Sequence, residues 1–439
     1  MRLIFVAMLV ISFLAVPAVA PAAPTFPQFG AQVVLPSSTG DGEPSIATDG
    51  AGVIYVASPG SGDVRAQAGV PVSVNGGTIT VGFQGAHTHV YRSANGGASF
   101  ARVADTLGAS GDSDVATDAD GKVYVSDLSS NVPVSVSANN ATSFSFLVPT
   151  AAGGSLDRQW LLASGHGNVW SFYRDSSTER VGISHDGGLT YTIGVVVPTD
   201  VAWTGNPVSR DGVNFYFPWT SSSAGDLHVA ASHDGGVTWT SHTAGAIVSG
   251  PELFPAVAVD AAGIVYVAWA DLAGSLGAVH VAHSSDSAVT FSAPVTVSPD
   301  GPYTMFPWLL ADAAGHVAVF WYEGDEPSPV AFGSDASAAS WSLAMAYATD
   351  ASSATPHWTT QRIATAIHTG SICDVGILCP PLYNPLVLNR EFLDFFEATE
   401  LPNGNIAVVF DVDGPAVTQL AQTQPELHVL VQNGGPNLK

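Results

Sequence analysis

One octapeptide recurs along the chain and constrains its fold more than any other feature. Its clearest copy is Ser232-His-Asp234-Gly-Gly-Val-Thr-Trp239, which follows a short alternating strand. The Asp side chain can accept hydrogen bonds from backbone amides just ahead of it, and Gly supplies the positive φ that a reversal needs. The aromatic residue then opens the next strand. The pattern predicts structural hairpin turns at Asn95, Asp186, Asp234 and Asp286, and in a weaker fifth copy at Asn139.

A second repeat alternates with the first and consists of two strands around an Asp/Gly turn. Its clear copies lie at 43–57, 114–125, 254–267 and 306–319, and looser ones at 157–173, 206–219 and 390–410. One unit is therefore strand A, an Asp/Gly turn, strand B, a variable loop, strand C, the octapeptide turn and strand D. Seven such units predict an all-β fold, a seven-bladed β-propeller with four-stranded antiparallel blades. A six-bladed ring, with one looser unit as an insertion, is the alternative.

The ends of the repeat region predict how the ring closes. The seventh unit stops after a C-like strand at 427–431, and an orphan strand at 31–35 precedes the first unit. We expect this N-terminal strand to complete the last blade, because that pairing removes a free strand edge.

Two insertions interrupt the spacing, at 60–85 and at 351–389. The first contains apolar alternation over 70–81 around Asn-Gly-Gly, which predicts an extra hairpin. The B–C and D–A connections leave a blade at the same end, so both insertions should lie on one face, the expected working face. The starts of the A strands and the ends of the B strands should ring the channel on that face, and they include Glu43, Asp112, Asp114 and Arg158.

The octapeptide resembles the Asp box of sialidase-like propellers, Ser-x-Asp-x-Gly-x-Thr-Trp. Two further segments, Asp157-Arg158-Gln-Trp160 and the Cys-containing loop that leads to Asn389-Arg390, resemble segments of secreted, sialidase-like Asp-box proteins of bacteria and archaea. This resemblance covers the whole mature chain. Most members of that group have no assigned reaction, so the resemblance implies the fold far more than the function.

The N-terminus and the composition indicate where the protein works. Met1-Arg2 and the apolar run that follows predict a signal peptide over 1–22 and a mature propeller over 23–439, with an uncleaved anchor as the alternative. Cys373 and Cys379 are expected to form a disulfide in an oxidising compartment; a zinc site that adds His368 is the alternative. We therefore expect a secreted or cell-surface monomer that is not inserted in the membrane after cleavage.

The charge balance restricts the partners of the chain. With 37 acidic and 12 basic residues the formal net charge is −25. Nucleic acid and anionic membrane surfaces are poor partners for such a field, whereas cations and basic ligands suit it. Calcium at the carboxylate-rich channel mouth is one hypothesis, since Ca²⁺ prefers oxygen ligands. The alternative explanation of the acid excess is solubility in a lysine-poor protein, and no metal ligand set is visible in the sequence.

The sialidase resemblance implies one catalytic hypothesis, an exo-glycosidase acting on terminal acidic sugars. Such enzymes hold the substrate carboxylate with three arginines and use a Tyr assisted by Glu as nucleophile. The matching candidates here are Arg158, Arg174, Arg390, Tyr322 (or Tyr303) and Glu252 (or Glu323). Two departures count against it: the N-terminal Arg-Ile-Pro motif is replaced by Glu43-Pro-Ser, and Tyr322 and Glu323 are strand neighbours that should face opposite ways. The arginines can instead form ion pairs with nearby acids, such as Asp157 and Asp394.

The sequence favours a second hypothesis, a non-catalytic glycan- or protein-binding module. Tryptophans near strand ends and an acidic rim suit recognition of a ligand. The binding candidates are Asp157, Trp269, Trp321 and Glu391, with Trp219 and Trp308 as further exposed aromatics. Packing between blades is the alternative role of each tryptophan.

Overall fold

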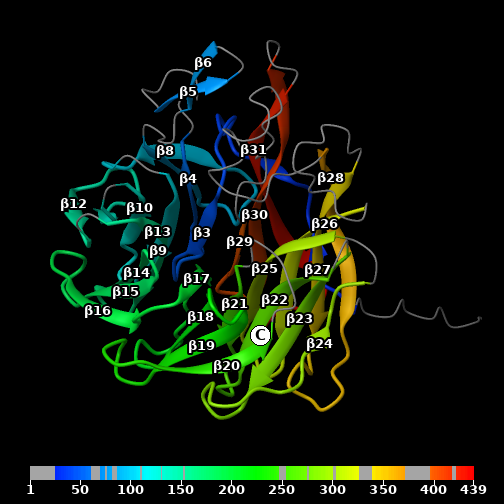
Figure 1. The fold of residues 1–439 in the computed structure, drawn as a ribbon. Helices are drawn as coiled ribbons and strands as arrows, with labels where there is room; N and C mark the ends of the chain where they lie inside the picture. Colours follow the sequence, from blue (N-terminus) through cyan, green and yellow to red (C-terminus); the bar gives the residue numbers. More distant parts are fainter. Residues whose placement is uncertain are drawn as a thin grey trace, which may run out of the picture.

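The computed structural model describes residues 25–60, 70–74, 77–81, 87–108, 111–129, 131–151, 154–246, 254–273, 276–299, 303–325, 339–370, 396–417 and 422–439. These residues form seven antiparallel blades that follow one another in chain order around a common centre, and one separate two-stranded sheet (Figure 1). Both the seven blades and their all-β architecture are as the repeats predict, and the six-bladed alternative is wrong. No helix in the described part of the chain is long and apolar enough to span a membrane.

The first four blades each contain four strands in the order A, B, C and D. Blade one has β3 (Ser45–Thr48), β4 (Ile54–Pro59), β7 (Thr88–Ser93) and β8 (Ala101–Asp105). Blade two has β9 (Ser113–Thr117), β10 (Val123–Asp127), β11 (Pro133–Ser137) and β12 (Phe146–Pro149). Blade three has β13 (Leu156–Ser164), β14 (Asn168–Asp175), β15 (Thr178–Ser184) and β16 (Thr192–Val197). Blade four has β17 (Val201–Thr204), β18 (Phe215–Ser221), β19 (Asp226–Ser232) and β20 (Thr240–Ala246).

Blades five and six repeat this order, and blade seven draws its outer strands from the other end of the chain. Blade five has β21 (Ala256–Val259), β22 (Val265–Ala273), β23 (Leu276–Ser284) and β24 (Val295–Thr296). Blade six has β25 (Tyr303–Ala311), β26 (Val317–Gly324), β27 (Ser340–Ala348) and β28 (Thr359–Thr369). Blade seven has β29 (Glu397–Glu400), β30 (Ile406–Val417) and β31 (Gln422–Gly434), with β1 (Gln28–Phe29) and β2 (Val33–Val34) outside them.

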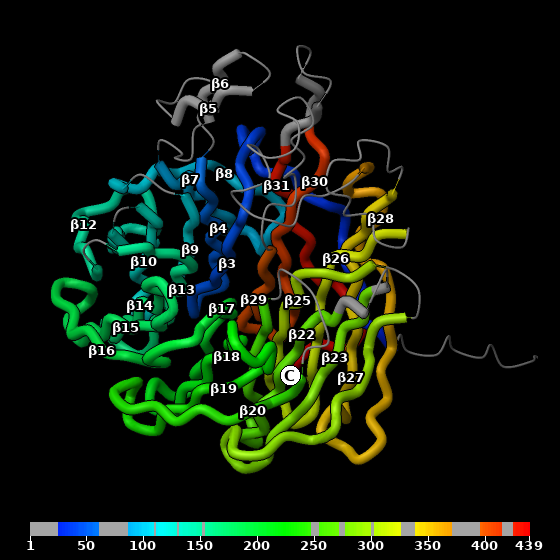
Figure 2. The backbone as a smooth tube through the Cα atoms, in the orientation of Figure 1, coloured from blue at the N-terminus to red at the C-terminus, as the bar shows by residue number. Residues whose placement is uncertain are grey.

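The N-terminal strands close the ring, as predicted. Val33 pairs with Val429, and Gln28 pairs with Gly434, so both β1 and β2 cover the outer edge of β31. The first strands of the described chain, β1 and β2, and its last strand, β31, therefore lie together in blade seven (Figure 2). At the centre, β29 of blade seven contacts β3 of blade one, which completes the circle of A strands.

The position of a strand in its blade determines its burial. The A strands gather around the centre and the D strands lie at the periphery (Figure 1). Every residue of β18 is buried, because both faces of a middle strand pack against other blades. The outer strand β12 instead alternates between half-buried and exposed residues. Most of the apolar core therefore lies between the blades.

The octapeptide turns have the predicted hydrogen bonds. The Asp234 carboxylate accepts the amides of Val237 at 3.1 Å and Thr238 at 2.9 Å, and the Thr238 hydroxyl at 2.6 Å. Ser232 Oγ accepts the amide of Gly236 at 3.0 Å. Asp186 and Asp286 accept equivalent bonds, and Asn95 and Asn139 use their side-chain oxygens in the same way.

The A–B turns hold consecutive blades together. Asp118 Oδ1 accepts the amides of Asp120 and Lys122 within its own turn, while Oδ2 accepts the amide of Gly167 in blade three at 3.2 Å. Asp260 of blade five binds the amide of Gly315 in blade six in the same way, at 2.9 Å. The turn aspartate thus stabilises both a reversal and a blade interface.

The insertions agree only in part with the expected boundaries. The hairpin expected within 60–85 is present, with β5 (Val70–Val74) paired to β6 (Gly77–Val81). In the second insertion, 351–389, residues 359–369 form β28, the D strand of blade six. The preceding C–D turn lacks the octapeptide: Asp350 accepts the amide of His357, seven residues ahead, at 2.9 Å. Residues 371–395, which include Cys373 and Cys379, lie outside the described residues.

Candidate functional site

The backbone is irregular at three positions where the A strands begin. Glu43, Arg158 and Phe306 have positive φ values of 50°, 50° and 54°, although none is glycine. The ladder is interrupted next to Arg158 in β13 and next to Phe306 in β25. Glu43 and Phe306 precede the turn aspartates Asp49 and Asp312 by the same number of residues. Such φ values cost free energy, so the surrounding structure must impose them.

Arg158 connects opposite parts of the channel mouth. Its guanidinium carbon lies 4.1 Å from the ring centroid of Phe254, which precedes β21 in blade five. Its Nη1 also lies 4.0 Å from Oδ2 of Asp112, which precedes β9 in blade two. The side chain is only 4% exposed. Arg158 is therefore a buried cation held between an aromatic ring and a carboxylate.

Four carboxyl residues lie at or just before the starts of the A strands of blades seven, one and two, and we call them the acidic wall: Glu397, Glu43, Asp112 and Asp114. The A strands have no further neighbour towards the centre, so their inner edges carry unpaired amides. Asp114 accepts the amide of Leu161 at 2.5 Å, and Glu397 accepts the amide of Ile46 at 3.0 Å. Each acid thus binds the A strand of the next blade and compensates its open edge.

Burial controls the protonation of two of these acids. Desolvation raises the pKa of Asp114 to about 7, although the amides of Leu161 and Val115 oppose the shift. Burial also raises the pKa of Glu397 well above its ordinary value, and the nearby charge of Asp114 adds to the shift. Both effects disfavour the charged forms, so this pair retains protons at a pH where exposed carboxyl groups are ionised.

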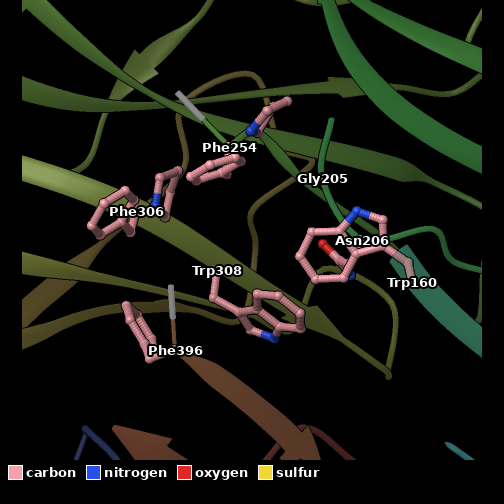
Figure 3. A pocket seen from close by; sticks show the side chains of 9 residues that line it. Trp160, Gly205, Asn206, Phe254, Phe306, Trp308 and Phe396 are labelled. Carbon is pink, nitrogen blue, oxygen red and sulfur yellow. The ribbon is translucent and has the colours of Figure 1, made fainter. Parts of the chain in front are cut away.

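A second group of residues near the starts of the A strands is aromatic, and we call it the aromatic wall: Trp160, Phe254, Phe306, Trp308 and Phe396. Together with Gly205, Asn206, Pro255 and Pro307 these residues line a small cavity (Figure 3). The Trp160 and Trp308 rings lie 6.1 Å apart, and Phe254 stacks on Phe306 at 5.7 Å.

The structure does not bring the described sialidase candidates into one site. Arg174 bonds to Asp157 and to the carbonyl oxygen of Ala202, and lies over the Trp203 ring, so it joins blades three and four. Arg158 lies instead in the channel mouth. Arg390 and Glu252 lie outside the described residues.

The candidate nucleophile Tyr322 is fully buried. Its ring packs against Phe396 at 4.7 Å, and its hydroxyl accepts the amide of Asp411 at 3.3 Å. Burial raises the pKa of this hydroxyl well above its usual value. Glu323 faces away from Tyr322, as predicted, and binds Arg362 at 2.6 Å. Tyr322 is thus shielded from a ligand in the channel.

The tryptophans expected at the surface are buried. Trp269 is 2% exposed and Trp321 is 0% exposed, and Trp219 and Trp308 are 7% and 9% exposed. Trp321 lies in the apolar cluster between blades five and six, and its Nε1 donates to Glu323 at 3.3 Å. The expectation of exposure is wrong, and the alternative, packing between blades, is confirmed for Trp269 and Trp321. Their indoles are needed to fill the space between sheets.

The remaining candidates are only partly placed. The Asp157 side chain is about one-third exposed beside Arg174, whereas Glu391 lies outside the described residues. His368 binds Asp413 at 2.5 Å, and the cysteines of the zinc alternative lie outside the described residues. Across the ranges that the structure describes, no three His, Cys, Asp or Glu side chains converge on a metal position.

Several channel residues were not identified from the sequence. The predicted sites do not include Glu397, Phe254 or Phe306. Glu397 belongs to the acidic wall, and Phe254 and Phe306 belong to the aromatic wall. Glu397 could have been found by alignment of the repeats, because it precedes its A–B turn by as many residues as Asp114 does. The protein is thus a seven-bladed β-propeller with acidic and aromatic residues clustered where its A strands begin.

Comparison with known proteins adds solved structures of low similarity. No protein-family model and no curated protein matches the chain. A protein of unknown function from Dyadobacter fermentans is 12% identical, with 94% of this chain and 100% of that chain covered and a TM-score of 0.46. The NanB sialidase from Streptococcus pneumoniae is 11% identical, with 90% and 69% covered and a TM-score of 0.46. YCF48 bound to D1 peptide is 11% identical, with 96% and 100% covered and a TM-score of 0.47.

Proposed function

We propose that this protein is a secreted, sialidase-like propeller that binds an extracellular protein or glycan at its channel mouth. Secretion is proposed from the apolar segment that follows Met1-Arg2. Binding is proposed for the face where the B–C and D–A connections emerge, because loops presented by a rigid scaffold commonly carry recognition.

The burial of Tyr322 is the observation that carries a binding role over hydrolysis. A covalent glycosidase needs a nucleophile that reaches the sugar, with a positioned base beside it. The buried Tyr322 ring packs against Phe306 and Phe396, which line the cavity, and the Glu323 carboxylate forms an ion pair with Arg362. This arrangement favours a scaffold role for Tyr322.

The second candidate function is an exo-glycosidase that acts on terminal acidic sugars. One observation supports it. Arg158 does reach the channel mouth, where a substrate carboxylate could contact an arginine. Hydrolysis with Arg158 at its centre would still require a nucleophile from elsewhere in the mouth.

The test compares turnover with binding. The purified mature protein is incubated with a fluorogenic sialoside from about pH 4 to about pH 8, alongside a Tyr322→Phe variant. We expect no turnover above the buffer rate from either protein. Turnover by the wild type that disappears in Tyr322→Phe would overturn the proposal.

Binding is measured on a glycan array and a panel of purified extracellular proteins, with Asp112→Asn as a mouth variant. Asp120→Asn is its matched control, because Asp120 follows the end of β9, whereas Asp112 precedes its start, and both residues are aspartates. We expect Asp112→Asn to weaken any ligand that is found and Asp120→Asn to leave it unchanged. A ligand affected equally by both variants would place recognition elsewhere.

A further inference from the structure

A row of three ionisable residues crosses blade three on the side that faces blade four. Arg174 of β14 is the central member, because it pairs across the sheet with Asp157 of β13 on one side and with Glu179 of β15 on the other. Directly opposed residues on neighbouring strands present their side chains on the same face of a sheet. One arginine therefore has a carboxyl residue beside it on each neighbouring strand.

Arg174 is bonded to the first of these two acids. Its guanidinium donates to the Asp157 carboxylate and to the carbonyl oxygen of Ala202 in blade four, and it lies over the ring of Trp203. The Asp157 side chain is about one-third exposed. The arginine thus connects an acid near the surface to the A strand of the next blade.

Glu179 is the acid without a hydrogen bond. Its side chain is 0% exposed, and neither carboxyl oxygen has a hydrogen-bond partner in the part of the chain that the structure describes. Val197 and Val201 are buried in the apolar cluster around it. Burial raises the pKa of Glu179 well above the ordinary value of 4.5, although the charge of Arg174 opposes the shift. A buried carboxyl group that loses its proton needs a cation beside it.

The titratable neighbours of Glu179 come from two strands. β13 contributes Asp157, whose negative charge adds to the raised pKa of Glu179, and β14 contributes Arg174 and Tyr173. Burial raises the pKa of Tyr173 above its ordinary value of 10, so this phenol is neutral at neutral pH. The adjacent strands β16 and β17 contain no ionisable side chain. Arg174 is therefore the cation closest to hand when Glu179 ionises.

We propose that Arg174 is a proton-controlled switch between two acids: it binds Asp157 while Glu179 is protonated, and it turns to Glu179 when that residue releases its proton to solvent. In the second state Arg174 leaves Ala202 and Trp203, so blade three loses a contact with blade four. The switch lies at the end of the blades from which the B–C and D–A connections emerge. It requires no ligand, so its failure would leave the proposed binding function unaffected.

The Trp203 indole reports the position of Arg174, because the guanidinium lies 5.6 Å from the centroid of that ring. With ¹⁵N-labelled tryptophan, NMR follows the indole N–H signal of the mature protein from about pH 5 to about pH 10, and a Trp203→Phe variant assigns the signal. We expect one titration step in the wild type and none in Glu179→Gln, which cannot ionise. A step that persists in Glu179→Gln would overturn the proposal.

Asp157→Asn shifts the balance towards Glu179. The variant removes the competing acid and one negative charge beside Glu179, so the midpoint of the Trp203 step should fall by about one pH unit. Asp175→Asn is the matched control, because Asp175 also lies in blade three and binds Arg180 at 3.0 Å, and it should leave the midpoint nearly unchanged. The same midpoint in Asp157→Asn and the wild type would show that the two acids do not compete for the arginine.

Arg174→Met removes the cation and keeps an unbranched side chain. The Trp203 step should then disappear from the measured range, because an uncompensated Glu179 retains its proton to higher pH. A step of wild-type size in Arg174→Met would mean that Glu179 acts on Trp203 without the arginine, which contradicts the proposal. Should this variant fail to fold, the comparison of the wild type with Glu179→Gln and Asp157→Asn decides alone. If neither the wild type nor Asp157→Asn shows a step, Arg174 keeps one position and the proposal is wrong.

Discussion

The amide of Leu161 in blade three donates a 2.5 Å hydrogen bond to the carboxyl group of Asp114 in blade two. Ile46 and Glu397 repeat this relationship between blades one and seven, at 3.0 Å. Each acid reaches across the inner edge of the propeller, where the A strands have no further strand partner. The carboxyl groups therefore stabilise the channel edges and also give the mouth its acidic wall.

Replacing Asp114 with Ala should destabilise the fold. The substitution leaves the buried amides of Leu161 and Val115 without their acceptor, at a cost of about 1–3 kcal/mol in the free energy of unfolding. Asp114→Asn keeps an acceptor oxygen and should cost less. Urea unfolding of the two variants and the wild type measures the difference. An Ala variant as stable as the Asn variant would show that these bonds contribute little.

Glu179 should make stability depend on pH. This residue of β15 is fully buried, neither of its oxygens has a hydrogen-bond partner, and burial raises its pKa well above the ordinary value of 4.5. Because the folded pKa lies above the unfolded one, stability is greatest below about 4.5 and falls as pH rises towards the folded pKa. Glu179→Gln cannot ionise and should be more stable than the wild type at neutral pH.

Melting temperatures of the two proteins across acidic to alkaline pH check this prediction. The advantage of Glu179→Gln should shrink as the solution becomes acidic, because the wild-type carboxyl group is then neutral as well. Parallel curves over the whole range would mean that Glu179 is hydrated or paired in solution.

The sequence predicts the blades well because the determinants of the turns are local. The carboxylate of Asp234 binds amides three and four residues ahead, so an octapeptide suffices to specify the reversal. The sequence does not predict the C–D turn of blade six, because the local octapeptide is absent there. Its aspartate, Asp350, binds an amide seven residues ahead, and the longer loop breaks the pattern while the hydrogen bond remains.

The channel was predicted less well because its determinants lie in different blades. Tryptophan is a residue type that often contacts ligands, but Trp321 is buried between blades five and six. Arg158 has a positive φ next to a shift in the strand register, and no glycine in the sequence indicates this conformation. Arg174 points towards blade four, whereas Arg158 contacts Phe254 of blade five, so the two arginines do not share a site. Strand periodicity does not determine these directions.

Asp234→Ala should lower the melting temperature by a few degrees and leave ligand binding at the mouth unchanged. Hydrogen bonds from Thr238, above all, hold the pKa of Asp234 at about 2. Since the folded pKa is depressed, this stabilisation is present above the ordinary pKa and is lost as pH falls towards about 2. Thermal melts and binding assays with Asp234→Asn as control test both halves. Lost binding with unchanged stability would overturn the topology.

Removal of the N-terminal strands should open the ring. Deletion of residues 25–35 takes away β1 and β2, which cover the edge of β31 through the pairs Gln28–Gly434 and Val33–Val429. An uncovered strand edge is a template for pairing with another chain, so we expect the truncated protein to dimerise or aggregate. Size-exclusion chromatography measures this against a control that lacks only residues 1–24. If the shorter protein stays monomeric and melts at the temperature of the control, the N-terminal strands do not close the propeller, and β31 must be protected in another way.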